Sequence, residues 1–322
     1  MFRLLHSIFT REDRGNGSYP AALIEKATQR ALDATDRRLH ALSGCQKELA
    51  PSIECAVDHV MKLVDGLAPP LSASPAGYSQ SPLLRAMFTS PARLVEVISR
   101  DTAFIEACRT GGLEDEYHAL LITSMSKRQF LGADLVEGVI RQDVVQTSVS
   151  FDEHRLIEVT REEAQTRLQL KRRAYDVILR QILEELEARQ TRQQALQGQR
   201  KLLRRKSELL KQAGWDLSAK TEANQDTAAL EVKLQQVEEE LSALGSPGDT
   251  LNIHLALLRD ALTEPAKLLS LENASIILDR RNIERTTVDE HANQIDIQVL
   301  KDQQGNQVVI ALVKIDPRHL TA

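Results

Sequence analysis

One face of the chain repeats every seven positions across residues 159–213, and its residues are apolar except for Arg189. The repeating positions are Leu168, Tyr175, Ile182, Arg189, Leu196, Leu203 and Leu210. No proline interrupts this stretch, so the spacing predicts one long helix whose repeating face packs as a coiled coil. At about 1.5 Å per residue, such a helix would be roughly 80 Å long.

A second apolar series follows, with spacings that alternate between four and three residues. Its members are Leu230, Leu234, Val237, Leu241 and Leu244, and after a break at 245–248 the heptad phase resumes at Leu251, Leu255, Leu258 and Leu262. Residues 214–226 are polar and are interpreted as a tip where the chain turns back. We therefore predict an antiparallel coiled-coil hairpin over residues 159–272, with a parallel dimer through residues 159–213 as the alternative geometry.

The two helical segments of the predicted hairpin, its arms, carry charges of opposite sign, as the hairpin requires. Residues 159–213 carry 14 Lys and Arg against 7 Asp and Glu, whereas residues 220–244 carry 2 against 6. Opposite charges flank the seams of paired helices. A hairpin would also bring the break near Pro247 level with the polar part of the first arm, near Gln193.

Helical patterns dominate residues 1–112, which we interpret as an N-terminal helical region. Helices are predicted over residues 20–42 and 51–67, and a third is expected to begin at the Ser90 cap and end before Gly111 and Gly112. Residues 68–81 are rich in proline and serine, and this composition predicts a linker.

Strands are predicted in two separate regions. In residues 113–158, period-two alternation predicts a strand over 145–151, and apolar runs rich in strand-forming residues predict strands over 117–125 and 130–140, with Lys127 and Arg128 at the turn between them. The pattern of residues 117–125 fits a helix equally well. In residues 273–322, strands are expected over 275–278, 295–300 and 307–315, the last two joined by a turn at 303–306. The predicted fold is α+β and mostly helical, with one small antiparallel sheet formed by strands on both sides of the hairpin.

The composition favours a soluble cytoplasmic protein. The chain has 322 residues, 42% hydrophobic content, 3% aromatic content and a net charge of −5. No apolar run reaches the roughly 18 residues of a membrane span. The apolar run in residues 1–10 is shorter than the hydrophobic segment of a signal peptide. These residues are expected either to dock on the protein or to contact a membrane or a partner. Cys45, Cys55 and Cys108 lack metal-site spacing and are expected to be free thiols.

Few residues are candidates for chemistry. His118, Asp152, Glu153 and His154 include two imidazoles and carboxylates that could bind a divalent metal, although the last three equally suit exposed residues at a strand end. No glycine-rich phosphate loop or nucleophile elbow is found. We therefore predict no enzymatic activity, no cofactor and no metal.

Two features of the hairpin are candidates for partner binding. Arg200, Arg204 and Arg205 belong to the densest basic cluster, together with Lys201 and Lys206, and this cluster suits either ion pairs with the acidic arm or contact with phosphates. Trp215, at the predicted tip, is expected to anchor a partner or to close the end of the seam.

The sequence alone therefore favours a scaffold or adaptor protein that forms homo-oligomers and binds an unidentified protein partner along the hairpin or at its tip. The alternative is a nucleic-acid-binding factor that uses the basic rows of the long helix.

Overall fold

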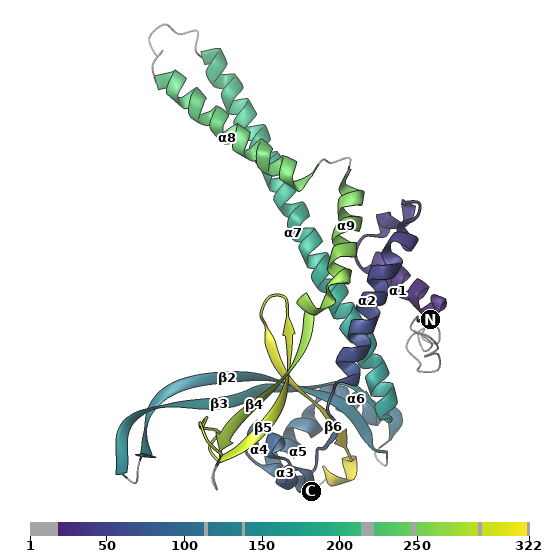
Figure 1. The fold of residues 1–322 in the computed structure, drawn as a ribbon, viewed down its shortest axis with the longest axis vertical. Coiled ribbons are helices and arrows are strands. Elements are labelled where there is room, and N and C mark those ends of the chain that lie inside the picture. The colour runs from purple at the N-terminus through teal and green to yellow at the C-terminus, as the bar shows by residue number, and fades with distance from the viewer. Residues whose placement is uncertain are drawn as a thin grey trace. The chain divides into compact units, whose positions relative to one another are not determined.

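The computed structural model describes residues 19–112, 115–136, 139–213, 222–245, 249–288 and 292–320. Within these residues the chain is α+β, with nine α-helices and a six-stranded sheet (Figure 1). The chain divides into two compact units. The first contains residues 56–177 and 265–322, and the second contains residues 19–55 and 178–264.

The sheet of the first unit joins strands that lie far apart in the sequence. Its strands are β1 (Leu71–Ser72), β2 (Tyr117–Val136), β3 (Val139–Thr160), β4 (Leu269–Asp279), β5 (Ala292–Asp302) and β6 (Gln307–Ile315). Their order is β3-β2-β6-β5-β4, and neighbours on this path are antiparallel. The predicted union of the two strand regions in one sheet is therefore confirmed, because β2 pairs with β6 from Tyr117 opposite Ile315 to Thr123 opposite Val309.

Residues 68–81 differ from the predicted linker. They contain β1, which pairs in parallel with β6 beyond the part of β6 that pairs with β5, and helix α3 (Pro75–Gln80). Ala73 is completely buried, and Ser74 caps α3 by accepting a hydrogen bond from the Gly77 backbone N–H. Proline and serine here act as helix-start residues, which is why their composition resembled that of a linker.

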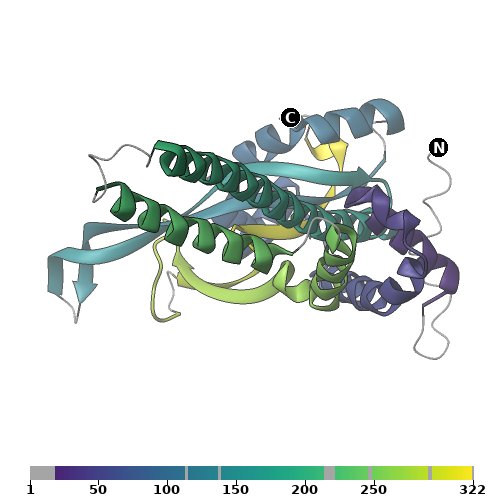
Figure 2. The same ribbon diagram turned by 90° about the horizontal axis from the view of Figure 1, so that it is seen from above.

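The expected three-strand meander in residues 113–158 is wrong. Lys127 and Arg128 lie in the middle of β2, opposite Val149 and Ser148 of β3, so two long strands replace three short ones. Beyond Thr123, β2 no longer pairs with β6, and β2 and β3 continue as a two-stranded ribbon (Figures 1 and 2). The side chains of Lys127 and Arg128 are exposed, and Lys127 pairs with Glu284 at 2.6 Å, so both charges are accommodated within the strand without a turn.

Three irregularities in β3 interrupt its pairing with β2. Each register shift coincides with an acidic residue in the left-handed backbone region, at Asp143 (φ 64°), Glu153 (φ 55°) and Glu158 (φ 52°). Such bulges add a residue to one strand and increase its local twist. Because β3 continues to Thr160, the long helix begins at Glu163 and not at residue 159 as predicted.

One face of the sheet is covered by four short helices. They are α3, α4 (Pro82–Met87), α5 (Pro91–Arg100) and α6 (Thr102–Gly111). The buried core between them includes Phe88, Leu94 and Phe104 from the helices and Tyr117 and Phe151 from the strands.

The single helix predicted after Ser90 is in fact two helices. Ser90 caps α5 as expected, but Asp101 ends α5 and caps α6 through the backbone N–H groups of Ala103 and Phe104. The second carboxylate oxygen of Asp101 accepts a hydrogen bond from the Leu156 N–H of β3 at 2.8 Å. Asp101 thus breaks the helix and fixes the break to the sheet.

The second unit contains α1 (Ala21–Ala34), a 3-10 helix η2 (Arg37–Ala41), the start of α2 (Cys45–Asp65), and α9 (Thr250–Thr263). The buried His254 of α9 lies 2.8 Å from Asp36, and Ser52 of α2 hydrogen-bonds Thr263 at 2.9 Å. Hydrogen bonds from Arg38, together with the bond to His254, lower the pKa of Asp36 below its usual range. These contacts connect α9 to the N-terminal helices.

We predict that His154 makes the stability of the first unit depend on pH. Its ring stacks on Phe88 with centroids 4.4 Å apart, its Nε2–H donates to the Met87 carbonyl oxygen, and burial lowers its pKa below 6.5. Between the folded pKa and 6.5, the unfolded chain binds more protons than the folded chain. The free energy of unfolding should therefore be highest above pH 6.5 and fall as the pH is lowered through this window.

The matched variant is His154→Gln, which keeps a donor for Met87 but cannot be protonated. In urea unfolding between pH 7.5 and 5, the wild type should lose stability relative to the variant. A difference between the two proteins that stays constant over this range would contradict the burial of a neutral imidazole.

Candidate partner-binding surface on α7 and α8

The long helix α7 (Glu163–Ala213) contacts helix α8 (Glu222–Leu244) through a narrow apolar seam. Leu196 of α7 forms a buried cluster with Val237 and Leu241 of α8, and Leu203 and Leu244 pack against it. These leucines and the valine belong to the two apolar series found in the sequence. The periodicity therefore identified the residues that meet in this seam.

Polar contacts mark the end of the seam where α8 ends. Arg189 donates to the Leu244 carbonyl oxygen at 3.0 Å, and the Gln193 side-chain amide donates to the Gly245 carbonyl oxygen at 3.3 Å. Carbonyl groups in the last turn of a helix lack partners within the helix, and here α7 supplies two donors. Arg189 and Gln193 of α7 therefore lie beside the C-terminal end of α8.

Two ion pairs flank the seam. Arg192 lies 3.0 Å from Glu240, and Arg204 lies 2.6 Å from Glu238. These side chains are between 41% and 67% exposed, so each pair contributes about 0.2–1 kcal/mol at most. The ion pairs select the orientation of the two helices more than they stabilise it, because like charges would meet in other registers.

A different set of apolar residues points away from the seam. Leu202 and Leu209 of α7 are 67% and 65% exposed, and Val232 of α8 is 56% exposed. The two leucines are seven residues apart and so lie on one side of the helix, next to the exposed residues Lys201 and Arg205. Lys201 and Arg205 form no ion pair with another described residue.

The residues predicted for partner binding differ in exposure and in their contacts. Arg204 pairs with Glu238, Arg200 is half-buried on α7, and Arg205 is exposed. Trp215 lies outside the described residues. The exposed leucines were not singled out from the sequence, although Ala188, Ala195, Leu202 and Leu209 form a second series with a spacing of seven.

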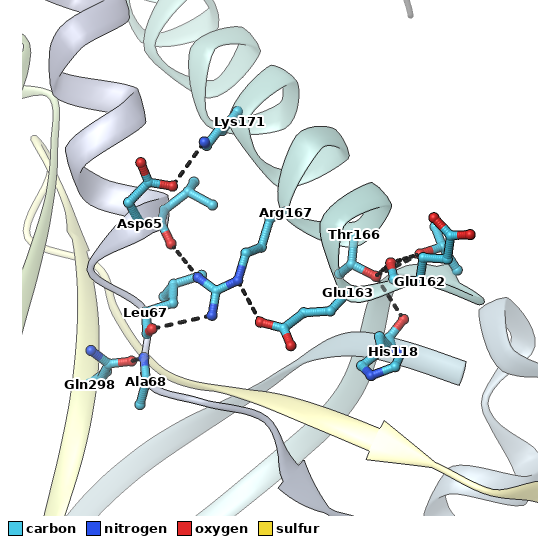
Figure 3. A network of polar contacts seen from close by, with 12 residues as sticks. Asp65, Leu67, Ala68, His118, Glu162, Glu163, Thr166, Arg167, Lys171 and Gln298 are labelled. Carbon is cyan, nitrogen blue, oxygen red and sulfur yellow. Dashed lines mark hydrogen bonds and ion pairs between the residues drawn. The ribbon is translucent and has the colours of Figure 1, made fainter. Parts of the chain in front are cut away.

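A separate polar cluster lies where α7 begins, in the first unit (Figure 3). The Arg167 guanidinium donates to the carbonyl oxygens of Val64 and Leu67 at 2.8 and 3.4 Å, and to Glu163 at 2.7 Å. Val64 lies in the last turn of α2 and Leu67 lies just after the helix ends at Asp65, where backbone carbonyl groups need donors from outside the helix. Arg167 therefore acts as a side-chain cap that joins α2 to α7.

The polar contacts around Arg167 also join different helices and strands of the first unit. Lys171 is buried and pairs with Asp65 at 2.8 Å, while the Thr166 hydroxyl donates to the His118 carbonyl oxygen of β2 at 3.1 Å (Figure 3). Gln298 of β5 donates to the Gly66 carbonyl oxygen at 3.0 Å. These contacts join α2, α7, β2 and β5 within the first unit.

Arg172 is half-buried on α7. Its Nε and Nη2 atoms are buried and have no hydrogen-bond partner among the described residues, and burial lowers its pKa. An arginine keeps its charge even when its pKa falls, so this part of α7 carries a partly buried cation.

The candidate metal residues do not come together. Tyr117 and Ala119 point into the core beneath the short helices, so His118 between them points to the opposite face of β2. His154 instead stacks on Phe88 of that core. Among the described residues, no three His, Cys, Asp or Glu side chains are grouped closely enough to hold a metal ion.

Comparison with protein-family models, with curated proteins and with solved structures finds no match. The helices in the described part of the chain include none with the length and apolar character needed to cross a membrane.

We predict that the seam and the outer face of α7 respond differently to truncation. Leu196→Ala removes a side chain that is 8% exposed and should cost about 2–4 kcal/mol of unfolding free energy. The matched control Leu202→Ala removes the same atoms from a site that is 67% exposed and should change stability by about 0.5 kcal/mol or less. Equal losses in chemical unfolding would mean that the seam is assigned to the wrong face.

We also predict that Arg167→Met destabilises the first unit by about 1.5–3 kcal/mol, because the carbonyl groups of Val64 and Leu67 lose a charged donor. The control Arg173→Met changes another arginine of α7. It removes only an ion pair with Glu158, and the Arg173 side chain is 50% exposed. Thermal unfolding of both variants should rank Arg167→Met well below Arg173→Met. The reverse order would show that Arg167 is not a structural cap.

Proposed function

We propose that this protein is a non-enzymatic, cytoplasmic scaffold or adaptor that self-associates and binds a protein partner through the outer face of α7 and α8. In this proposal the two helices form an antiparallel coiled-coil hairpin. The partner-binding residues are Leu202 and Leu209, with Arg200 and Arg205 beside them and Trp215 at the tip.

One observation carries the proposal: α7 has two apolar faces in its distal half, and described residues bury only one of them. Leu196 is buried against α8, whereas Leu202 and Leu209 are exposed next to Lys201 and Arg205, which form no ion pair with another described residue. A heptad-spaced apolar stripe with charged flanks is the usual docking site for another helix. The charges on this stripe are basic, so its complement is an amphipathic helix with acidic flanks.

The polar positions in the seam support a role in specificity. Arg189 and Gln193 take positions that would otherwise hold leucines, and each bonds a carbonyl group at the end of α8. Polar residues inside a coiled coil fix register and partner choice at the expense of stability. The hairpin would thus keep one alignment while its outer face remains available.

Nucleic-acid binding is the second candidate. Lys201 and Arg205 are exposed and free of ion pairs with other described residues, which favours contact with phosphates. Against it, Arg204 is already paired with Glu238, and no aromatic residue lies within the basic cluster to stack on bases.

We predict that replacing both exposed leucines abolishes partner capture. The double variant Leu202→Glu, Leu209→Glu should lose its specific partner in affinity purification from the native cell, because glutamates cannot enter an apolar interface. The control Gln190→Glu, Gln199→Glu adds the same charge at exposed positions of the same helix and should retain the partner. Identical partners for both variants would refute the assignment of the surface.

The nucleic-acid alternative has its own test. Binding of a fluorescent DNA or RNA duplex should be absent, or weak and equal in wild type and in Lys201→Gln, Arg205→Gln. Strong binding that falls steeply with salt and is lost in this double variant would instead favour the alternative.

A further inference from the structure

The sheet of the first unit opens between β5 and β6. Their pairing ends with Gln298 opposite Ile310, and β1 pairs with the same edge of β6 only from Leu71 opposite Val313. Between these two pairings, β6 has no strand partner on this edge among the described residues. A cavity of about 270 Å³ lies at this gap. Its volume is close to the lower end of the range of roughly 300–1,000 Å³ for ligand pockets.

The cavity has an apolar side and an acidic side. Its apolar lining includes Pro82 and Leu83 of α4 and Ile295 of β5, and Ile295 belongs to the core beneath the short helices. Asp296 also lines the cavity. Because side chains alternate along a strand, the Asp296 carboxylate points to the face of the sheet opposite to Ile295. A ligand in the gap therefore meets apolar side chains on one face and a carboxylate on the other.

The backbone N–H of Leu312 points into this gap. The Lys314 carbonyl oxygen accepts a hydrogen bond from the Ala73 N–H at 2.8 Å on this edge of β6, and residues two apart direct their backbone groups to the same edge. Leu312 is 2% exposed, and its N–H has no hydrogen-bond partner among the described residues. Buried N–H groups without a partner are rare in proteins, so this donor is suited to a ligand's acceptor.

The facing edge of β5 supplies the complementary acceptor. Asp296 lies two residues before Gln298 on β5, and Leu312 lies two residues after Ile310 on β6, so the Asp296 carbonyl group faces Leu312 across the gap. A trans amide directs its C=O and its N–H in opposite directions. One amide placed between the strands can therefore accept from Leu312 and donate to Asp296, as a strand inserted into a sheet does.

We propose that this cavity binds an extended peptide segment of a partner protein, which inserts between β5 and β6. The inserted amide connects the Leu312 N–H to the Asp296 carbonyl oxygen. The residue before this amide places an apolar side chain beside Leu83 and Ile295. The residue after it points to the opposite face and is basic, because the exposed Asp296 carboxylate forms no ion pair with another described residue.

This site is independent of the partner-binding face of α7. It uses residues of the first unit alone, whereas Leu202 and Leu209 belong to the second unit. Each proposal can therefore fail while the other stands.

A blocked dipeptide tests the inserted amide directly. Acetyl-leucyl-lysine N-methylamide, titrated into the full chain, should move the NMR signal of the Leu312 amide proton to lower field, because this N–H gains an acceptor. The matched peptide with a methyl group on the lysine amide nitrogen has no donor for the Asp296 carbonyl group. Its dissociation constant should be higher by about threefold or more.

Filling the cavity provides the second arm. Ala68 lines the cavity and is exposed, so Ala68→Trp should leave the fold intact and abolish binding of the peptide. The control Ala76→Trp places the same side chain at an exposed position of α3 that does not line the cavity, and it should bind as the wild type does.

Charge exchange at Asp296 tests the basic residue of the peptide. The wild type should prefer the lysine peptide to the matching glutamate peptide by about two- to fivefold, and Asp296→Lys should reverse this preference. The proposal is overturned if the Leu312 signal does not respond to the lysine peptide, if methylation of the amide leaves binding unchanged, or if the two tryptophan variants bind equally.

Discussion

The pairing of β2 with β6 is the constraint on which the rest of the structure depends. Seven residue pairs join a strand that begins at Tyr117 to a strand that ends at Ile315. The chain between β3 and β4 must therefore leave the sheet and return to it. A helix as long as α7 satisfies this requirement only if later segments run back toward its start, and α8 and α9 follow it in the chain. Closing so long an excursion costs little more entropy than closing a short one, because that cost grows only logarithmically with length.

The helical segment also explains why function is proposed on its surface. A two-helix contact buries one face of each helix, and the seam between α7 and α8 is narrow, with polar contacts at Arg189 and Gln193. Leu202 and Leu209 are then left outside it. The basic cluster was recognisable from the sequence, but its division into the paired Arg204 and the exposed Arg205 was not. That division depends on where Glu238 lies in space, which periodicity does not specify.

Local patterns predicted the elements that local forces control. The bounds of β6 were predicted correctly, because its continuous apolar run begins shortly after a turn that contains Gly305 at a positive φ of 84°. The errors arose where distant partners decide the conformation. Lys127 and Arg128 continue β2 because β3 pairs with them, and residues 68–81 are ordered because β1 pairs with β6. Asp101 divides two helices because its carboxylate also bonds Leu156, 55 residues away in the sequence.

The central claim is that α7 and α8 fold against each other within one molecule. Spin labels attached at Lys201→Cys on α7 and Gln236→Cys on α8, two exposed positions, measure the distance between the helices directly. The protein carries Cys55→Ser, and the labelled protein is also measured after dilution with unlabelled protein. Helices in contact have axes about 8–10 Å apart, so the account predicts a label separation below roughly 25 Å that dilution leaves unchanged. A short distance that disappears on dilution would show that the helices meet only between molecules, and would contradict the account.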